Sequence, residues 1–460
     1  MEYKDFLKSK QITVQSHGFE PVGINPLLFQ WQSDIVRWAL KKGKACIFAD
    51  CGLGKTPMQL QWAHEVAEHA DKPVLILAPL AVAQQTKREG VKFNVAVTIC
   101  RSQKDVCAGV NIANYEMIEH FEPSAFAGIV LDESSILKHA SSKTRQLLTE
   151  LFRYTSYKLC CTATPAPNDF MELGTHSEFL GVMSQTEMLS TFFIHDGGDT
   201  AKWRLKGHAE SKFFEWVAGW ACCMTNPSDL GYEQGGFDLP PLNIHEVIIK
   251  SDELENGDGQ QMLFAETTQT LNDRRTARRN SMNDRALAAA EIANATNEQV
   301  LVWCDLNAES ETLAQSIIGA VEVKGAHTLA YKENAMSGFT NGENRVLVSK
   351  PSIAGWGMNW QQCNKMIFVG LSDSFEAYYQ AMRRCWRFGQ TKPVDVYIVI
   401  SDAEGAVKAN IERKQRDAER MTSELVKFTK DILAADIRQT TRMSETYITS
   451  ERMELPKWTA

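Results

Sequence analysis

The chain has 460 residues, enough for two or three domains, because a single hydrophobic core seldom grows beyond about 250 residues. Apolar residues make up 44% and charged residues 23%, values typical of a globular protein with a sizeable core. Lys and Arg number 49 against 57 Asp and Glu, so the formal charge of −8 excludes a histone-like basic coat for nucleic acid. It leaves open an enzyme whose basic residues line one cleft.

Neither a membrane span nor a leader is expected. No stretch reaches the roughly 18–20 apolar residues of a membrane helix, and the charged first ten residues are unlike a signal peptide. The eleven cysteines are odd in number, contain no Cys-x-x-Cys pair and sit mostly in apolar runs. We therefore expect buried, reduced thiols in a cytoplasmic protein.

Short continuous apolar runs recur along the chain and predict strands of parallel sheets that are covered on both faces. In the first half these runs are residues 45–49, 74–78, 129–131 and 158–162. Helix-like segments lie between them at 58–70 and 142–152. In the second half the runs are 300–304, 345–349, 365–369 and 394–400, and a charged helical segment follows at 408–430. This order predicts an α/β protein with two halves.

Glycine and proline pairs at 235–241 break any regular element and separate the two halves. We predict a first domain at 1–240, a linker at 241–251, a second domain at 252–430 and a tail at 431–460. Residues 185–235 are rich in aromatic side chains and poor in strand signal. They are expected to form a helical elaboration of the first domain, with the aromatic rings in its core.

The sharpest local motif is Asp50-Cys-Gly-Leu-Gly-Lys-Thr56, which follows a predicted strand and precedes a predicted helix. This is the context of a phosphate-binding loop, in which Gly52 and Gly54 let main-chain N–H groups face the phosphates. Lys55 would reach the β- and γ-phosphates, and Thr56 would place its hydroxyl on Mg²⁺. The helix dipole favours the same negative charge.

A second motif, Gly128-Ile-Val-Leu-Asp-Glu133, is an apolar strand that ends in adjacent carboxylates. Asp132 would hold Mg²⁺, and Glu133 would orient or deprotonate the attacking water. An acidic strand end facing solvent is the alternative, which the upstream phosphate loop disfavours. Further upstream, the Gln32 amide has the groups to bond adenine at two positions. Together these motifs predict a site for ATP and Mg²⁺.

The motifs resemble, in kind and order, those of the superfamily-two helicase-related ATPases, and within them the Swi/Snf-type DNA translocases. The resemblance covers roughly residues 28 to 430. Its segments are Leu28-Phe-Gln-Trp-Gln32, Asp50–Thr56, Leu77-Ala-Pro79, Asn114-Tyr115, Asp132-Glu-Ser-Ser-Ile-Leu-Lys138, Thr162-Ala-Thr-Pro165, 300–306, 349–359 and Gln380-Ala-Met-Arg-Arg-Cys-Trp-Arg-Phe-Gly-Gln390. The last segment is the strongest match.

The resemblance implies two tandem RecA-like lobes with parallel sheets, a helical insertion after Thr162–Pro165 and a helical C-terminal extension. It implies that Gln32 and Gln380 contact the nucleotide. Arg384 and Arg387 are three residues apart, so on a helix they would share a face and act as arginine fingers on the transferred phosphoryl group. The residues expected to couple nucleotide state to movement are Ser135, Thr162, Thr164 and Gly357.

The sequence departs from the family pattern in several places. Ser134 and Ser135 replace the usual Ala-His, so a hydroxyl or another group must provide that coupling. Arg383 stands where many relatives carry Asp, and the loop before Gly52 is one residue shorter than in many remodellers. Because the chain leaves no room for histone-reading modules, we expect a compact bacterial or bacteriophage form, acting in the cytoplasm.

Two sets of residues are candidates for nucleic-acid contact. By resemblance, hydroxyl and main-chain groups would hold phosphates at Ser142, Lys143, Ser349 and Lys350. The densest basic cluster, on a helix-like stretch, consists of Arg274, Arg275, Arg278 and Arg279, with Arg285 beyond it. Contacts from this cluster would make binding salt-dependent, but a solvated or internally paired face is an equal alternative.

The leading hypothesis is an ATPase that translocates on duplex DNA, remodelling it or migrating its branches. Branched, replication or recombination intermediates are candidate substrates. One alternative is a helicase directed to RNA or single strands, and another is an ATP-gated clamp that holds nucleic acid without moving along it. We expect a monomer in solution, and the sequence leaves open which protein, if any, recruits it.

Overall fold

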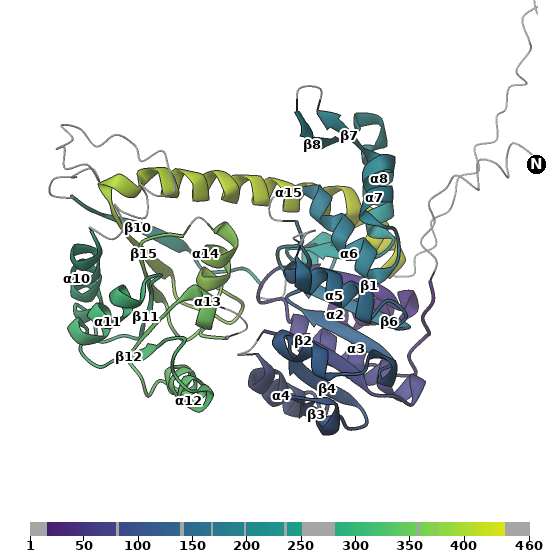
Figure 1. Ribbon diagram of the computed structural model, residues 1–460, viewed down its shortest axis with the longest axis horizontal. Coiled ribbons are helices and arrows are strands. Elements are labelled where there is room, and N and C mark those ends of the chain that lie inside the picture. The colour runs from purple at the N-terminus through teal and green to yellow at the C-terminus, as the bar shows by residue number, and fades with distance from the viewer. Residues whose placement is uncertain are drawn as a thin grey trace, which may run out of the picture.

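The computed structural model describes residues 16–437, apart from 80–81, 139–141, 167–168, 197–198, 234–236, 251–280, 356–357 and 373. Figure 1 shows two α/β lobes side by side, with one long helix running across both of them. Each lobe is built on a sheet of parallel strands. The predicted fold, two tandem lobes with parallel sheets, is therefore confirmed.

The first lobe contains a seven-stranded sheet in the order β3-β4-β2-β5-β6-β1-β9. The strands are β1 (Lys44–Ala49), β2 (Val74–Ala78), β3 (Val97–Ile99), β4 (Val110–Asn114), β5 (Gly128–Asp132), β6 (Tyr157–Thr162) and β9 (Ala221–Met224). All neighbouring pairs are parallel. The carboxyl ends of β1, β5 and β6 therefore meet at one edge, where binding sites of such sheets form.

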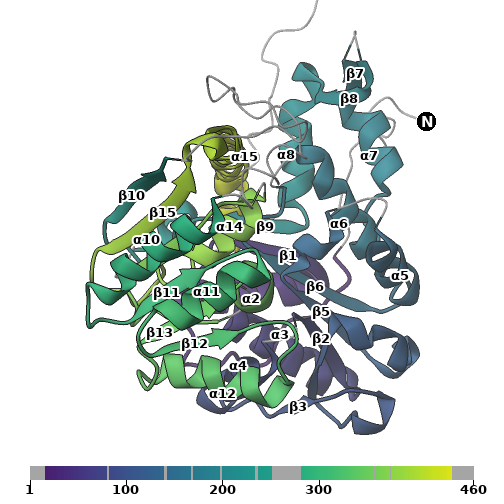
Figure 2. The ribbon, with the colours of Figure 1, turned by 60° about the vertical axis from the view of Figure 1, so that its left-hand side comes forward.

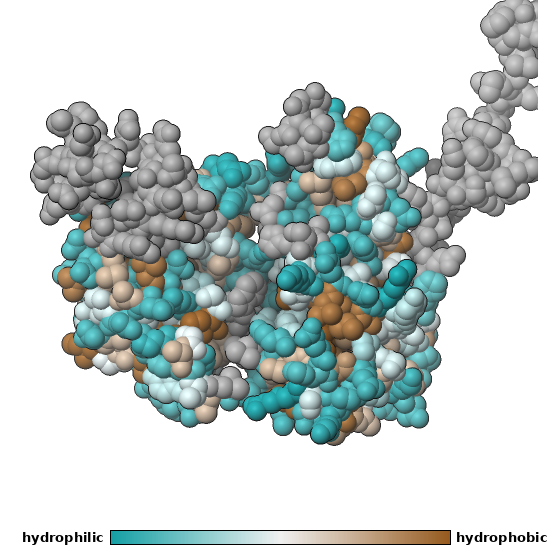
Figure 3. All heavy atoms as spheres, viewed as in Figure 1, coloured by the Kyte–Doolittle hydropathy of each residue, from teal (hydrophilic) through white to brown (hydrophobic). Residues whose placement is uncertain are grey.

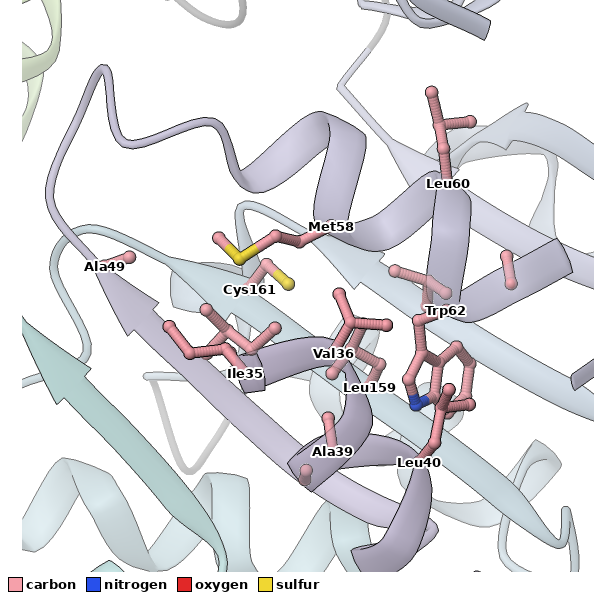
Figure 4. Packing of buried hydrophobic residues seen from close by; sticks show 14 of the residues in the cluster. Ile35, Val36, Ala39, Leu40, Ala49, Met58, Leu60, Trp62, Leu159 and Cys161 are labelled. Carbon is pink, nitrogen blue, oxygen red and sulfur yellow. The ribbon is translucent and has the colours of Figure 1, made fainter. Parts of the chain in front are cut away.

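The helices of this lobe are α2 (Gln30–Lys42), α3 (Lys55–Ala70), α4 (Ala83–Lys92), α5 (Lys143–Leu151), α6 (Leu173–Leu180), α7 (Gln185–Phe192) and α8 (Glu210–Ala218). Short 3₁₀ turns connect elements at η1 (Gln103–Asp105), η2 (Tyr115–His120), η3 (Pro123–Ala125), η4 (Ser134–Leu137), η5 (Phe170–Glu172), η6 (Gly207–Ala209) and η7 (Pro227–Leu230). Figure 4 shows Ile35 and Val36 of α2 and Met58 and Trp62 of α3 packed over the sheet beside Leu159. This packing fixes the start of α3, and with it the loop that precedes α3.

The second lobe contains a six-stranded sheet in the order β10-β15-β14-β11-β13-β12. Its strands are β10 (Leu242–Ile249), β11 (Val300–Trp303), β12 (Ala320–Val323), β13 (Val346–Ser349), β14 (Lys365–Val369) and β15 (Val394–Ser401). Its helices are α10 (Met282–Asn294), α11 (Asn307–Ser316), α12 (Leu329–Thr340), α13 (Pro351–Ala354) and α14 (Phe375–Met382), with the 3₁₀ turn η8 (Asp402–Glu404). All pairs of this sheet are parallel as well.

Two predicted segments differ from the structure. The linker predicted at 241–251 contains β10, which pairs along its whole length with β15. Residues 185–235, predicted to be helical, also contain the antiparallel hairpin β7 (Phe193–Asp196) and β8 (Asp199–Leu205), as well as the edge strand β9. Most β10 side chains are exposed, so the strand lacks the continuous apolar run that identified the central strands.

The long helix α15 (Gly405–Ile437) joins the two lobes. Val407 and Ile411, near its start, lie in the core of the second lobe. Leu433 and Ile437, at its end, lie in the core of the first lobe. Figures 1 and 2 show the helix along and nearly end-on, passing from one lobe to the other. The helix predicted at 408–430 is thus confirmed and extends further at both ends.

The surface and the thiols agree with the composition. The face in Figure 3 is mostly hydrophilic, with hydrophobic residues in scattered groups. Among the described helices, none has both the length and the apolar character needed to cross a bilayer. All eleven cysteines lie in the described part of the chain and are free thiols; ten are buried and Cys107 is exposed.

Candidate nucleotide site between the lobes

The phosphate loop lies between β1 and α3, at the carboxyl edge of the first sheet. Gly52 and Gly54 have φ values of 91° and 69°, a region that favours glycine. A Cβ atom at position 52 would lie 2.8 Å from the Phe388 main-chain nitrogen, so the second lobe approaches this loop closely. The Lys55 ammonium donates hydrogen bonds to the main-chain oxygens of Ala49 (2.9 Å) and Asp50 (3.3 Å).

The paired carboxylates follow β5, as the sequence predicts. Gln59 of α3 donates a hydrogen bond of 2.7 Å to Asp132 Oδ1. Burial, together with the neighbouring charge of Glu133, raises the pKa of Asp132 to about 6. Glu133 has a φ of 54°, and its buried Oε2 has no hydrogen-bond partner among the described residues. A buried carboxylate oxygen without a partner is costly and is typical of a site that receives a ligand or water.

These residues fit a magnesium–nucleotide complex. Within the described ranges, no group of three or more His, Cys, Asp or Glu side chains could hold a metal ion by itself. Mg²⁺ commonly takes one or two protein ligands and completes its shell with phosphate oxygens and water. The Asp132 carboxylate and the Thr56 hydroxyl offer that donor set. The positive charge of Lys55 lies close enough to lower the pKa of Asp132, although burial and Glu133 raise that pKa by more.

Gln32 of α2 supports the phosphate loop directly. Its amide oxygen accepts a hydrogen bond from the Phe29 main-chain nitrogen (3.1 Å), and its amide nitrogen donates to the Leu53 oxygen (3.2 Å). The side chain is buried. Both ends of the amide therefore bond to main chain in this structure, and the contact of Gln32 with adenine stays a prediction.

One face of α14 and its C-terminal end meets the first lobe. Glu376, Tyr379, Gln380 and Arg383 are spaced at i, i+3, i+4 and i+7, so they lie on one side of the helix. We call these four residues the α14 face. Figure 1 shows α14 on the side of its lobe that is nearest to the first lobe. The four side chains are buried or partly buried, and each contacts a motif of the other lobe; Gln380 Oε1 lies 3.8 Å from the Cys51 sulfur.

The contacts of the α14 face converge on the nucleotide motifs. Arg383 Nη2 donates to Asp50 Oδ2 (2.8 Å) and to the Cys51 oxygen (2.5 Å). The Tyr379 hydroxyl donates to Asp50 Oδ1 (2.5 Å). Glu376 forms an ion pair with Lys138 and accepts a hydrogen bond from the Thr164 hydroxyl (3.4 Å). The phosphate loop, the Asp132–Lys138 segment and the Thr162–Pro165 motif therefore all touch one helix of the second lobe.

The expected arginine fingers adopt a different arrangement. Helix α14 ends at Met382 and turns follow, so the prediction that a helix carries both Arg384 and Arg387 is wrong. Their Nη1 atoms both donate to the Met358 oxygen at 3.1 Å, within the second lobe. Burial and the like charge of Arg384 lower the pKa of Arg387 to about 10. The finger role of both residues stays a prediction.

The predicted coupling residues occupy the core near the site. Ser135 and Thr162 are buried, and the Thr162 hydroxyl accepts a hydrogen bond from the Thr164 main-chain nitrogen (3.1 Å). Gly357 lies outside the described residues. No motif in the sequence pointed to His176 of α6, whose Nε2 lies 3.1 Å from the Ser134 hydroxyl. Burial lowers the pKa of His176 to about 4, so the ring is neutral at pH 7.

The candidate nucleic-acid contacts have different outcomes. Ser142 and Lys143 lie at the start of α5, and Lys143 is exposed. Ser349 is completely buried and donates its hydroxyl to the Val323 oxygen (2.8 Å), so the hydroxyl has a partner inside the lobe, and its phosphate contact stays a prediction. Lys350 follows it at the start of α13 and is partly exposed.

Only one arginine of the basic cluster lies in the part of the chain that the structure describes. Arg274, Arg275, Arg278 and Arg279 lie outside the described residues. Arg285 is fully buried and pairs with Glu309 (2.9 Å) and Glu404 (3.4 Å). For Arg285 the internally paired alternative is therefore the correct one.

The chain also matches known families over both lobes. Residues 31–193 match the SNF2-related domain, and residues 282–389 match the helicase conserved C-terminal domain. The first match includes the phosphate loop and the paired carboxylates, and the second includes the α14 face and both expected finger arginines.

Similar proteins were found among curated sequences and solved structures. The chain is 26% identical over 204 residues to a CHD3-type chromatin-remodeling factor of Arabidopsis thaliana, covering 39% of this chain. It is 27% identical over 176 residues to an ISWI chromatin-remodeling complex ATPase of Saccharomyces cerevisiae, covering 33% of this chain. These matches span only 16% of the length of either relative. The structure of the Sulfolobus solfataricus SWI2/SNF2 ATPase core in complex with dsDNA matches with a TM-score of 0.41 and 17% identity, over 91% of this chain and 98% of that one.

Proposed function

We propose that the protein binds and hydrolyses ATP between its lobes and uses the energy to move along duplex DNA. One observation carries the nucleotide site: buried polar atoms without partners occur on both sides of the boundary between the lobes. Among the described residues these include Glu133 Oε2 from the first lobe, and Gln380 Nε2 and Arg387 Nε from the second. Acceptor and donor groups of this kind suit a ligand that contains phosphates, a metal ion and water.

Each residue then has a definite task. Lys55 exchanges its main-chain partners for phosphate oxygens, and Asp132 and Thr56 hold Mg²⁺. Mg²⁺ held there would supply positive charge that offsets the negative charge of the phosphates. Glu133 orients the attacking water and accepts its proton. Arg384 and Arg387 stabilise the charge that develops on the transferred phosphoryl group once their bonds to Met358 open.

The coupling of hydrolysis to movement is supported by the position of the site. Nucleotide motifs of the first lobe contact the α14 face of the second lobe, so a change at the phosphates changes the fit between the lobes. Duplex DNA as the track is supported by the SNF2-related domain and by the chromatin-remodeling relatives. The exposed Lys143 and the partly exposed Lys350 are the described candidates for phosphate contact.

The test measures ATP hydrolysis with no nucleic acid, duplex DNA, single-stranded DNA and RNA. Duplex DNA is expected to stimulate turnover most strongly. Lys55→Ala should abolish hydrolysis, and Glu133→Gln should bind ATP without turning it over. Lys92→Ala, which removes an exposed cation paired with Glu89, is the matched control and should behave as wild type. Hydrolysis that duplex DNA does not stimulate would reject the translocase.

The same experiment separates the alternatives. Stimulation by RNA or single strands would select the strand-directed helicase, and ATP-dependent DNA binding without turnover would select the clamp. Displacement of a triplex-forming strand, measured beside unwinding of a forked duplex, then distinguishes translocation from strand separation. A translocase displaces the third strand and leaves the fork paired.

A further inference from the structure

An acidic side chain stands inside the phosphate loop. Asp50 directly follows β1, five residues before Lys55. A carboxylate beside bound phosphates repels them, and the repulsion is strong where protein shields the charges from water. The Lys55 ammonium bonds to the main-chain oxygens of Ala49 and Asp50, and its hydrogen bonds therefore do not go to the Asp50 carboxylate. The loop therefore needs another cation if it is to bind a nucleotide tightly.

The cation comes from the other lobe. Arg383 approaches Asp50 Oδ2 to 2.8 Å, and the Tyr379 hydroxyl donates to the other carboxylate oxygen at 2.5 Å. The Cys51 main-chain nitrogen also donates to Oδ1 (2.6 Å), which holds the carboxylate towards α14. Among the described residues the cation that pairs with the Asp50 carboxylate thus belongs to the second lobe, so this ion pair requires the two lobes to be in contact.

The surroundings of Arg383 hold it in this position. Its side chain is 4% exposed, and its guanidinium carbon lies 5.0 Å from the centre of the Trp386 ring and 5.8 Å from that of Tyr379. The Trp386 ring is itself fixed by a hydrogen bond to the Pro240 oxygen (2.8 Å). A planar guanidinium that packs against aromatic rings loses little freedom on pairing with a carboxylate.

We propose that Arg383 is a positioning residue that neutralises Asp50 when the lobes meet, so that the phosphate loop binds ATP more tightly in the closed arrangement. This inference rests on the proposed ATP site and adds the means by which the second lobe controls it. Because linkage between two equilibria is reciprocal, ATP then favours closure by the same factor. With the lobes apart, the exposed Asp50 charge favours release of the nucleotide.

The experiment measures the dissociation constant of a fluorescent ATP analogue with Mg²⁺ by titration of the full chain, without DNA. Arg383→Gln leaves Asp50 charged and is expected to weaken binding roughly tenfold, within the usual range of such coupling. A double variant with both Arg383→Gln and Asp50→Asn lacks the repelling charge as well, so it should recover most of the affinity for the ATP analogue. Asp50→Asn alone leaves Arg383 positive beside the loop and should bind more tightly than wild type. Arg413→Gln, which breaks an exposed ion pair with Asp417, is the control for a lost arginine.

Opposite outcomes would overturn the proposal. A merely structural role for the ion pair predicts that the double variant binds as weakly as Arg383→Gln and that Asp50→Asn alone also weakens binding. The Asp50→Asn result stands even where Arg383→Gln does not fold, since the two variants are measured separately. Lys55→Ala tests the site itself: unchanged analogue binding in that variant would reject the ATP site. Absence of duplex-stimulated hydrolysis would reject only the translocase.

Discussion

The indole nitrogen of Trp38 donates a hydrogen bond of 2.8 Å to the carboxylate of Asp436, although the two residues lie 398 positions apart in the chain. Lys42 forms an ion pair with the same carboxylate at 3.0 Å. Both partners belong to α2, the helix that also carries Gln32 against the phosphate loop. The end of α15 is therefore fastened to the helix that supports the nucleotide site.

The attachment of α15 predicts a large cost for removing a side chain at its end. Leu433 is fully buried in the first-lobe core, so Leu433→Ala is expected to lower the free energy of unfolding by about 2–5 kcal/mol. Urea unfolding followed by circular dichroism measures this difference. Arg420→Ala, at an exposed position of the same helix, should change it little. Equal effects of the two substitutions would show that α15 is not held by the first-lobe core.

The raised pKa of Asp132 predicts a pH-dependent stability in the metal-free protein. The folded pKa of about 6 exceeds the ordinary value of 3.8, so the folded state binds the extra proton between these pH values. The contribution of this protonation to the free energy of unfolding is present at low pH and is lost as the pH rises through about 6. Asp132→Asn should therefore stabilise the protein above pH 6, by on the order of 3 kcal/mol.

Urea unfolding in the presence of EDTA measures the stability difference between Asp132→Asn and the wild type. The measurement is repeated from pH 4.5 to 7.5 in steps of about half a unit. The gain in the free energy of unfolding from Asp132→Asn should shrink towards the acid end. In a separate assay with Mg²⁺, the variant should not hydrolyse ATP at any pH. Asp431→Asn, at an exposed position of α15, is the control and should show no such trend. A gain that does not vary with pH would contradict the raised pKa.

The contact between Ser134 and His176 predicts a second stability effect. The two side chains are buried and lie 3.1 Å apart, so Ser134→Ala leaves the His176 Nε2 atom without this partner. The expected loss is about 1–3 kcal/mol in the free energy of unfolding. Ser190→Ala removes an exposed hydroxyl that donates to the Glu187 main-chain oxygen, and it should cost much less. Thermal unfolding of the two variants and the wild type, under the same conditions, measures both losses of stability. Equal losses would contradict the role of the Ser134–His176 contact.

The ion pair of Glu376 with Lys138 predicts control of the distance between the lobes. Glu376→Lys would bring two positive charges together at a buried boundary, which is costly unless the lobes move apart. We expect a larger radius of gyration in small-angle X-ray scattering of this variant. Glu291→Lys makes the same charge change at an exposed position of α10 and should leave the radius unchanged. A compact Glu376→Lys protein would show that this pair does not hold the lobes together.

Much of the fold follows from the apolar runs. Strands β2 and β14 have the predicted bounds, because each is covered on both faces and reads as an unbroken apolar segment. Strand β10 lies at the edge of its sheet with most side chains exposed, and β12 is only half buried, so neither gives such a run. The hydrophobic pattern reports burial, and these strands are weakly buried.

The candidate site was predictable where one segment contains the chemistry. The phosphate loop and the paired carboxylates are local motifs, and the structure brings them to one edge of a sheet. The pairing of Arg383 with Asp50 depends on how two lobes meet, which no local pattern contains. Likewise, Ser349 ends a strand whose side chains are all buried, and a motif alone does not reveal that burial. His176 gave no signal, because a single histidine in an apolar helix is usually a core residue.

Cys107 differs from the other ten thiols of the chain in being exposed. A maleimide dye should therefore attach to the native first lobe at this one position, without removal of the buried cysteines. Glu343→Cys, on an exposed turn of the second lobe, supplies the matching attachment point for a second dye. Energy transfer between the two dyes would then follow the approach and separation of the lobes in single molecules, during turnover.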